Sequence, residues 1–209
     1  MNIYQVFTRL YGACKPAKNL PNGTIADNGV AKFNEFTADT LQRIKDYGFT
    51  HVWFTGVLEH ATKTDYTRYG IHLDHPWNVK GRAGSPYAIK DYFDVDPDLA
   101  EDVPNRMAEF EALLERTHKT GLKLVIDFVP NHVARSYHSD VAPKGFEDLG
   151  VGDDEELETT SIIAGVNHCI RKTLLKQRRV VFHILNILPK QLVTMFFTLG
   201  PIVMIGTKQ

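Results

Sequence analysis

Three polar side chains that can bind a ligand lie at the end of a long apolar run in the middle of the chain. Residues 122–129 are mostly apolar; Asp127 lies within this run, and Asn131 and His132 follow it. Such a run is typical of a strand buried on both faces, as in a parallel sheet, and Pro130 ends it because proline has no N–H to donate. A carboxylate, an amide and an imidazole therefore stand at the carboxyl end of a buried strand, the edge at which α/β folds bind ligands. The alternative is structural, because Asp and Asn after a strand often only satisfy a turn.

The segments that would position these side chains alternate between strands and helices. The first helical segment has Leu41, Ile44 and Tyr47 along one face. The expected elements are a strand at 3–7, a helix from a Thr37 cap to Gly48, a strand at 49–55, a helix from an Asp102 cap through Pro104 to Gly121, and a strand at 122–129.

The connections between these segments are asymmetric. Those after strands are long, at residues 8–36 and 56–102, whereas those after helices are only one or two residues. This asymmetry is typical of a (β/α) barrel, which builds its function on the loops at the carboxyl face. The rival is a doubly wound nucleotide-binding fold, which would need a glycine-rich fingerprint after the first strand. Residues 12–16 do not supply one, so the pattern favours the barrel.

A second stretch, residues 84–98, places aromatic and acidic side chains in the loop after the second strand. Residues 127–132 resemble the first conserved region, D-x-V-x-N-H, of the α-amylase family of glycoside hydrolases (the family 13 type). The positions similar to the family segment after strand two are Tyr87, Asp91-Tyr92 and Val95-Asp96-Pro97. The start of this segment departs from the usual form, because two residues separate Gly84 from Tyr87.

The resemblance implies roles for four residues. Tyr87 matches a tyrosine that stacks on the sugar ring beside the bond to be cut, and an aromatic face suits the apolar C–H face of a sugar. His132 matches a residue that hydrogen-bonds the same ring, and Asp127 one that orders the site from beneath. Asn131 matches a position whose carbonyl oxygen often binds a structural calcium ion, which prefers oxygen ligands. The implied substrate is an α-glucan or malto-oligosaccharide; the alternative leaves Tyr87 and Tyr92 as ordinary packing aromatics.

The resemblance covers residues 1–160 and implies an incomplete (β/α)8 TIM barrel with an atypical C-terminal tail. The expected domains are 1–132, the first part of the catalytic barrel with strands one to three; 133–160, the start of the domain inserted after strand three; and 161–209, the tail. Glycoside hydrolysis needs two carboxylates across the scissile bond, and the family takes them from later strands. No catalytic residue is therefore assigned. We expect a truncated, inactive fragment of a glycoside hydrolase of α-glucans, and the alternative is a non-catalytic carbohydrate-binding remnant.

Composition narrows the remaining possibilities. The net charge of −1 gives no argument for a nucleic-acid or membrane partner, and we infer no obligate protein partner. Two cysteines are too few for a disulfide framework. No signal peptide precedes the first strand, so we expect a cytoplasmic protein or a fragment whose leader is missing. The histidines and aspartates of residues 60–75 do not have the spacing of a zinc site, and we expect them to belong to a solvated loop.

The tail differs from the rest of the chain in charge. Residues 161–209 hold no acidic residue and seven basic ones, whereas residues 1–160 have a net charge of −8. One interpretation is a membrane-associated segment at the apolar residues 180–206, although prolines and Lys190 interrupt it. We favour a shifted coding frame. A shift of one nucleotide can turn residues 189–197 into a polar string that resembles the family's inserted domain.

Overall fold

The computed structural model describes residues 1–12, 22–129, 132–145 and 148, and the backbone of 194–199 and 202–205. Its strands form a five-stranded sheet in the order β1-β2-β5-β6-β7 and a two-stranded sheet of β3 and β4. The strands are β1 (Ile3–Phe7), β2 (His51–Thr55), β3 (Leu58–His60), β4 (Ile89–Val95), β5 (Lys123–Phe128), β6 (Thr194–Leu199) and β7 (Ile202–Ile205). The α-helices are α1 (Ile25–Asn28), α2 (Ala38–Asp46) and α3 (Arg106–Lys119).

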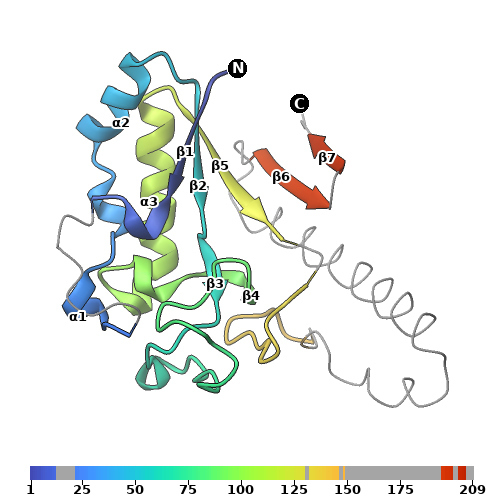
Figure 1. Cartoon of the computed structure of the whole chain (residues 1–209). Helices are drawn as coiled ribbons and strands as arrows, with labels where there is room; N and C mark the ends of the chain where they lie inside the picture. Colours follow the sequence, from blue (N-terminus) through green and yellow to red (C-terminus); the bar gives the residue numbers. More distant parts are fainter. Residues whose placement is uncertain (13–21, 130–131, 146–147, 149–193, 200–201, 206–209) are drawn as a thin grey trace.

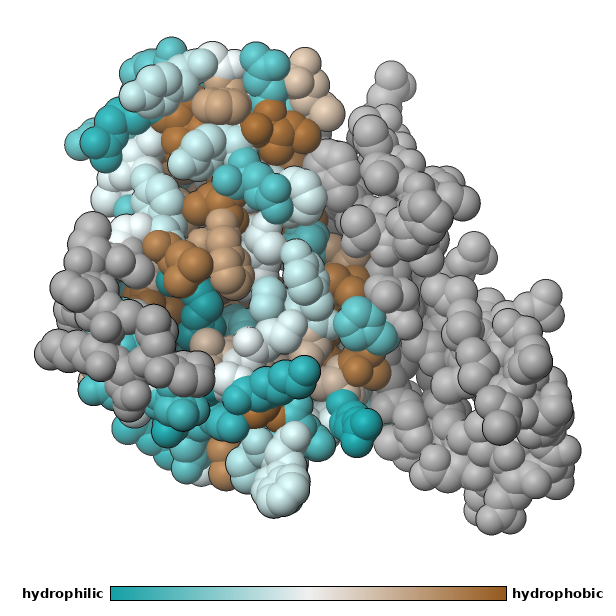
Figure 2. Space-filling model, viewed as in Figure 1, coloured by the Kyte–Doolittle hydropathy of each residue, from teal (hydrophilic) through white to brown (hydrophobic). Residues whose placement is uncertain are grey.

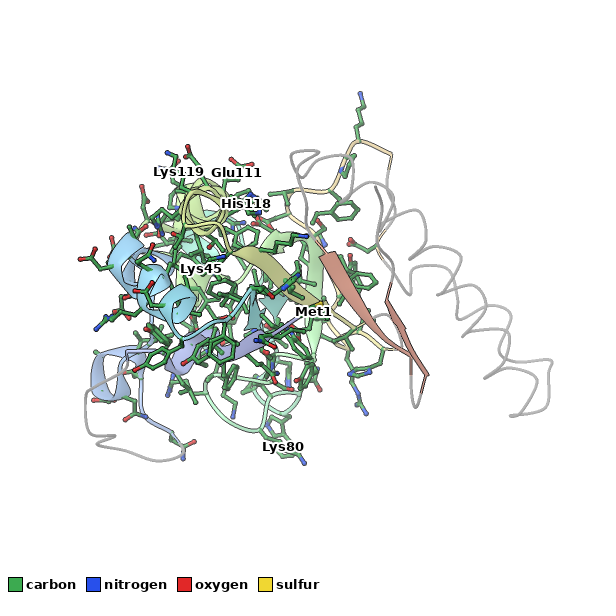
Figure 3. The ribbon with its side chains drawn as sticks, turned by 90° about the horizontal axis from the view of Figure 1, so that it is seen from above. Met1, Lys45, Lys80, Glu111, His118 and Lys119 are labelled. Atoms are coloured by element: carbon green, nitrogen blue, oxygen red, sulfur yellow. The ribbon has the colours of Figure 1, made fainter. Side chains whose placement is uncertain are left out.

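The larger sheet begins with the three strands that the sequence predicts. β1 pairs with β2 and β2 with β5, both in parallel, so that Phe7 lies opposite Thr55 and Phe54 opposite Ile126. Parallel strands need crossover connections, and α2 and α3 supply them on one side of the sheet (Figure 1). In the view from above, Lys80 lies on one side of the described part of the molecule and the labelled residues of α3 lie on the other (Figure 3). Lys80 belongs to the segment between β3 and β4. The α/β arrangement is therefore as expected.

The two crossover helices bury the faces that their sequences predict. In α2, Thr37 accepts a hydrogen bond from the Thr40 N–H and so caps the helix, while Leu41 and Ile44 are buried. In α3, Phe110, Leu113 and Leu114 are buried. These side chains pack with the buried residues of β2 and β5 in one hydrophobic core. Burial of this apolar surface is the main force that holds the helices on the sheet.

Three details of these helices differ from the expectation. Tyr47, predicted on the apolar face of the first helix, is 84% exposed, because it lies one residue beyond the end of α2. α3 begins at Arg106, since Val103–Asn105 forms a separate 3₁₀ turn that contains Pro104. Asp102 does not cap the helix; its carboxylate accepts a hydrogen bond from the Asn105 side chain instead.

Residues 56–102 contain the small antiparallel sheet of β3 and β4, which the sequence reading treated as a loop. This sheet lies beyond the carboxyl ends of β1, β2 and β5 (Figure 1). All seven residues of β4 are buried, including Lys90, Asp91 and Asp94. A strand with so many buried charges has no simple alternation of polar and apolar side chains, which explains why the pattern hid it.

The tail contributes two strands that the sequence reading did not predict. β6 pairs with β5 in parallel, with residue 194 opposite Val125, and β7 pairs with β6 in the antiparallel direction. A (β/α)8 barrel is built of parallel strands, so β7 departs from that pattern. Along the middle of the face in Figure 2, exposed hydrophobic residues lie among hydrophilic ones. In the parts of the chain that are described, no helix combines the length and apolar character needed to cross a membrane.

Candidate functional site

The carboxyl ends of β1, β2 and β5 meet at one edge of the main sheet. Asp127, near the end of β5, accepts a hydrogen bond on its Oδ1 from the backbone N–H of Gly56, which directly follows β2, at 3.0 Å. At the neighbouring strand, the Thr8 hydroxyl donates to the carbonyl oxygen of Thr55 at 2.9 Å. These bonds fix the three strand ends relative to one another. The predicted placement of Asp127 at a sheet edge is therefore observed.

Two glycines allow the loop that carries Tyr87 to approach this edge. Gly56 has a φ of +76°, and a Cβ added there would lie 2.8 Å from Cβ of Pro86. Gly84 has a φ of +74°, and a Cβ there would lie 1.7 Å from the carbonyl oxygen of Ala61. Only glycine permits both this backbone conformation and such close approach. The loop is thereby held against the end of β2.

Tyr87 is 45% exposed at this edge. Its pKa is raised, first by partial burial and second by the negative charge of Asp127. Tyr92 differs, because it is 1% exposed and its ring packs against Phe128 and Tyr137. The packing alternative therefore describes Tyr92, and Tyr87 keeps a solvent-facing ring that a ligand can reach.

Asp127 is a buried acid. Burial raises its pKa, while the hydrogen bond from Gly56 and the charge of His60 act in the opposite direction. The pKa of this carboxyl thus depends on its burial, on the hydrogen bond from Gly56 and on the charge of His60 of β3.

His60 forms a buried ion pair beneath the site. Its Nδ1 lies 2.8 Å from Oδ2 of Asp96, and its Nε2 lies 3.1 Å from the carbonyl oxygen of Ala83. Both neighbours are hydrogen-bond acceptors, so both ring nitrogens carry a proton. Burial alone would lower the pKa of His60, but the charge and hydrogen bond of Asp96 together with the Ala83 carbonyl outweigh it, and the pKa is raised. The expectation that His60 belongs to a solvated loop is wrong, because the residue is 3% exposed.

Asp98 ties the segment after β4 to the segment after β1. Its Oδ2 lies 2.7 Å from Nη2 of Arg9, and its Oδ1 accepts a hydrogen bond of 2.7 Å from the hydroxyl of Tyr66. A buried carboxylate with two such donors is satisfied. The Arg9–Asp98 ion pair therefore holds the two segments together below the strand ends.

The remaining predicted residues follow β5. His132 is exposed, and its carbonyl oxygen accepts a hydrogen bond of 3.3 Å from the hydroxyl of Tyr92, which also donates to the carbonyl oxygen of Val129. Tyr92 thus contacts the chain at both Val129 and His132. Asn131, the predicted calcium ligand, lies outside the described residues. The structure therefore links Asp127 to Gly56, against which the loop of Tyr87 packs, and links His132 to Tyr92.

A second group of acids, which the sequence reading did not identify, lies between β3, β4 and the segment after β5. Burial raises the pKa of Glu59 to about 9, with the charge of Asp91 adding to the shift. Burial also raises the pKa of Asp91 to about 7, against the hydrogen bond that it accepts from the Phe93 N–H. The only signal in the sequence was the presence of acids inside the strands, which is unusual for buried positions.

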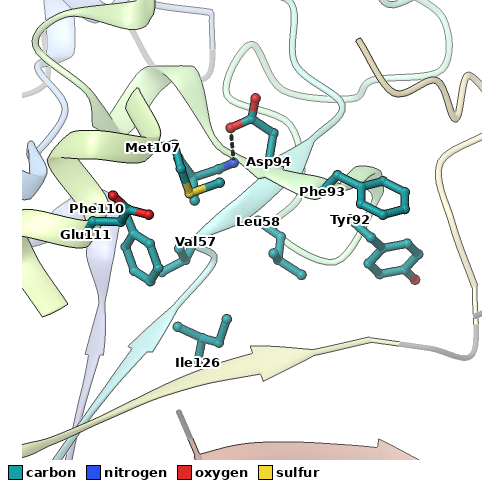
Figure 4. Close-up of a pocket in the computed structure, with 10 residues that line it drawn as sticks. Val57, Leu58, Tyr92, Phe93, Asp94, Met107, Phe110, Glu111 and Ile126 are labelled. Atoms are coloured by element: carbon teal, nitrogen blue, oxygen red, sulfur yellow. Dashed lines mark hydrogen bonds between the residues drawn. The ribbon is translucent and has the colours of Figure 1, made fainter. Parts of the chain in front are cut away.

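The structure also has an apolar pocket, separate from this site, between α3 and the strands (Figure 4). Met107 and Phe110 line it from the helix, and Val57, Leu58 and Ile126 line it from the sheet side. Tyr87, Asp127 and His132 do not belong to its lining. It is thus a gap in the packing around α3 rather than part of the polar strand edge.

Comparisons with known proteins agree with the sequence resemblance. A family model described as "Alpha amylase, catalytic domain" matches residues 37–144, a little over half of the chain. The chain is 24% identical over 107 residues to a 1,4-alpha-glucan-branching enzyme of Eremothecium gossypii, which covers 51% of this chain and 12% of that enzyme. It is 26% identical over 150 residues to a cyclomaltodextrin glucanotransferase of Niallia circulans, which covers 67% and 19%. Among solved structures, an alpha-amylase from Lactobacillus plantarum is 32% identical with a TM-score of 0.42, and the match covers 65% of this chain and 24% of that one.

Proposed function

Because this chain belongs to the alpha-amylase family, we propose that it is part of a glycoside hydrolase that acts on α-glucans. The chain spans only 12% and 19% of the two curated relatives described above. The activity of the whole protein is therefore a proposal. The observation that carries it is the exposed ring of Tyr87 on a loop that packs against Gly56, the residue that donates to Asp127 at the carboxyl ends of the strands. An exposed aromatic ring beside a polar edge suits a sugar, which has an apolar face and a rim of hydroxyl groups.

Each predicted residue has a distinct role in this proposal. The ring of Tyr87 stacks on a glucose unit, and the exposed His132 hydrogen-bonds a hydroxyl of that unit. Asp127 acts from below, where its bond to Gly56 fixes the end of β2. Asn131 remains a proposed calcium ligand. This set of residues can bind and orient a sugar, whereas the two carboxylates that glycoside hydrolysis needs are not among them.

Glucan binding by the Tyr87 ring is the first test. We expect Tyr87→Ala to weaken the binding of maltoheptaose to the chain about tenfold, since an aromatic contact is worth roughly 0.5–1.5 kcal/mol beyond its buried area. Isothermal titration calorimetry measures the change. Tyr87→Phe should retain binding, and Tyr47→Ala is the matched control because Tyr47 is 84% exposed at the end of α2. Equal losses in Tyr87→Ala and Tyr47→Ala would contradict the assignment.

Hydrolysis separates a glucan-binding fragment from a complete enzyme. We expect the 209-residue chain to release no reducing sugar from soluble starch, because the proposed site supplies no pair of catalytic carboxylates. A reducing-end assay with a commercial α-amylase as the positive control makes the measurement. Release of sugar above the no-protein blank would show that the chain holds a catalytic pair that this proposal does not contain.

A further inference from the structure

The small sheet places two buried carboxyl groups opposite each other. Glu59 of β3 and Asp91 of β4 are register partners in the antiparallel pair. They are 1% and 0% exposed. Like charges directly opposite on neighbouring strands destabilise a sheet, and burial makes the repulsion stronger because the dielectric is low. Something must offset this repulsion when both groups are ionised.

A third carboxyl group joins them from the segment after β5. This segment runs along β4, where the Ala134 N–H donates to the Ile89 carbonyl and the His138 N–H to the Lys90 carbonyl, at 2.7 and 3.0 Å. It thereby carries Asp140 to the pair, so that one oxygen each of Glu59, Asp91 and Asp140 lie within 4.8 Å of one another. The side chain of Asp140 is 18% exposed, which gives the group an opening to solvent.

The two neighbouring cations have other carboxylate partners. Lys90 Nζ lies 3.3 Å from Asp74 Oδ2 but 3.9 Å from Glu59 Oε1, and it also donates to the carbonyl oxygen of His72. Arg106 Nη2 pairs with Asp94 as well as with Asp140. Lys90 and Arg106 are thus two cations shared among five acidic groups, which are Glu59, Asp74, Asp91, Asp94 and Asp140.

The oxygens of Glu59 are also without donors. Among the described residues, neither of them accepts a hydrogen bond. Buried polar atoms are nearly always satisfied, and an ionised carboxylate without a partner is especially costly. Because one oxygen of each acid lies within 4.8 Å of the others, a cation placed between them would meet all three acids.

We propose that Glu59, Asp91 and Asp140 bind a divalent cation, and that this cation is calcium. Hard cations prefer carboxylate oxygens, and Ca²⁺ binds them at about 2.3–2.6 Å. Two oxygens on one Ca²⁺ are at most about 4.6–5.2 Å apart, so three oxygens within 4.8 Å of one another can share one ion. Mg²⁺ needs near-ideal octahedral geometry and usually keeps several waters, so a group of three protein carboxylates suits Ca²⁺ better. Water supplies the remaining ligands on the solvent side of Asp140.

The proposed ion has a structural role that does not depend on the glucan-binding proposal. It joins β3, β4 and the segment after β5, and these three carry His60, Tyr92 and His132 around the candidate site. Binding would therefore fix the loops that shape the site. It is also distinct from any ion at Asn131, since its three proposed ligands do not include that residue.

Calcium binding and thermal unfolding of the complete 209-residue chain test this proposal. The chain is stripped with EDTA, and CaCl₂ or MgCl₂ is titrated by calorimetry into the wild type, Glu59→Gln and Glu115→Gln. Glu115 is the matched control because it is 66% exposed on α3. Asn131→Ala is measured alongside to separate a site at that residue. Where Glu59→Gln does not give the wild-type circular dichroism spectrum, Asp91→Asn takes its place.

We expect Ca²⁺ to bind this acid group in the wild type, Glu115→Gln and Asn131→Ala alike, and at least tenfold more weakly in Glu59→Gln. Calcium at one hundred times its dissociation constant should raise the melting midpoint of the wild type by roughly 5 °C or more and leave Glu59→Gln unchanged. In EDTA, Glu59→Gln should melt no lower than the wild type, because it lacks a buried unpaired carboxyl. Absence of binding in the wild type, unchanged binding in Glu59→Gln, loss of binding in Asn131→Ala, or Mg²⁺ binding as tight as Ca²⁺ binding would overturn the assignment.

Discussion

Burial of the Asp127 carboxyl disfavours its ionised form. Its pKa is raised by burial, and such a carboxyl favours the folded state fully only below its unfolded pKa, near 3.8; that contribution is lost as pH rises through the folded pKa. Asp127→Asn keeps an oxygen that can accept from Gly56. We therefore expect this variant to be at least as stable as the wild type at pH 8, with the difference shrinking toward pH 4. Urea unfolding across this pH range measures the free energies.

The matched variant Asp127→Ala removes the acceptor as well as the charge. It should lose about 1–3 kcal/mol, because the buried N–H of Gly56 is left without its partner. If Asp127→Asn were less stable than the wild type at pH 8, the carboxylate would be stabilising the fold, contrary to the expected cost of its burial.

At this scale the sequence identified some residues and missed others for a physical reason. Asp127 and Tyr87 could be predicted, because a strand end and a family motif mark them. His60, Asp96 and Glu59 could not, because their importance comes from partners far along the chain: His60 pairs with Asp96 across 36 positions. The sequence around His60 and the sequence around Asp96 both have the composition of a polar loop. Only the tertiary structure shows which of their polar groups are buried together.

Gly84 affects how neighbouring elements pack, because it lets the loop that carries Tyr87 lie against the chain just after β3. A Cβ at Gly84 would lie 1.7 Å from a backbone oxygen, whereas a Cβ at Gly48, which also has a positive φ, would meet nothing within 4 Å. We expect Gly48→Ala to lose only about 1–2 kcal/mol from backbone strain and Gly84→Ala to lose clearly more. Urea denaturation of the two variants gives the comparison. Equal losses would show that the loop moves aside at no cost.

Elements with a regular pattern could be predicted, and those with a charged interior could not. β1, β2, β5, α2 and α3 lie within a few residues of their expected positions, since apolar periodicity and caps mark them. β3 and β4 were missed because the pairing of Glu59 with Asp91 gives no apolar alternation. β6 was missed because the tail was read by its charge rather than by its strand propensity.

At the scale of the whole molecule, the sequence predicts the start of a barrel, and the described strands support its first part only. The parallel order β1-β2-β5 follows the expectation, and β6 continues it in parallel. Among the described strands β1 pairs with β2 alone, so the sheet is not seen to close. Closure depends on strands whose sequence signal the prediction did not find, and the expected domain boundaries remain predictions.

The coding DNA of the tail decides between a shifted frame and a genuine apolar segment. All acids lie before residue 161, and the match to the catalytic-domain model ends at residue 144. If the frame shifts near residue 160, reading the DNA in the alternative frame should restore acidic residues and, further on, encode family carboxylates at strand ends. Retaining chemistry would then place the nucleophile and the acid/base about 5 Å apart. Sequencing the gene makes this measurement, and a single intact frame with no amylase-like continuation in either alternative would refute the shift. The pairing of β6 with β5 would then be a selected feature of the fold, because a strand that adds in parallel to a buried edge covers surface that would otherwise invite aggregation.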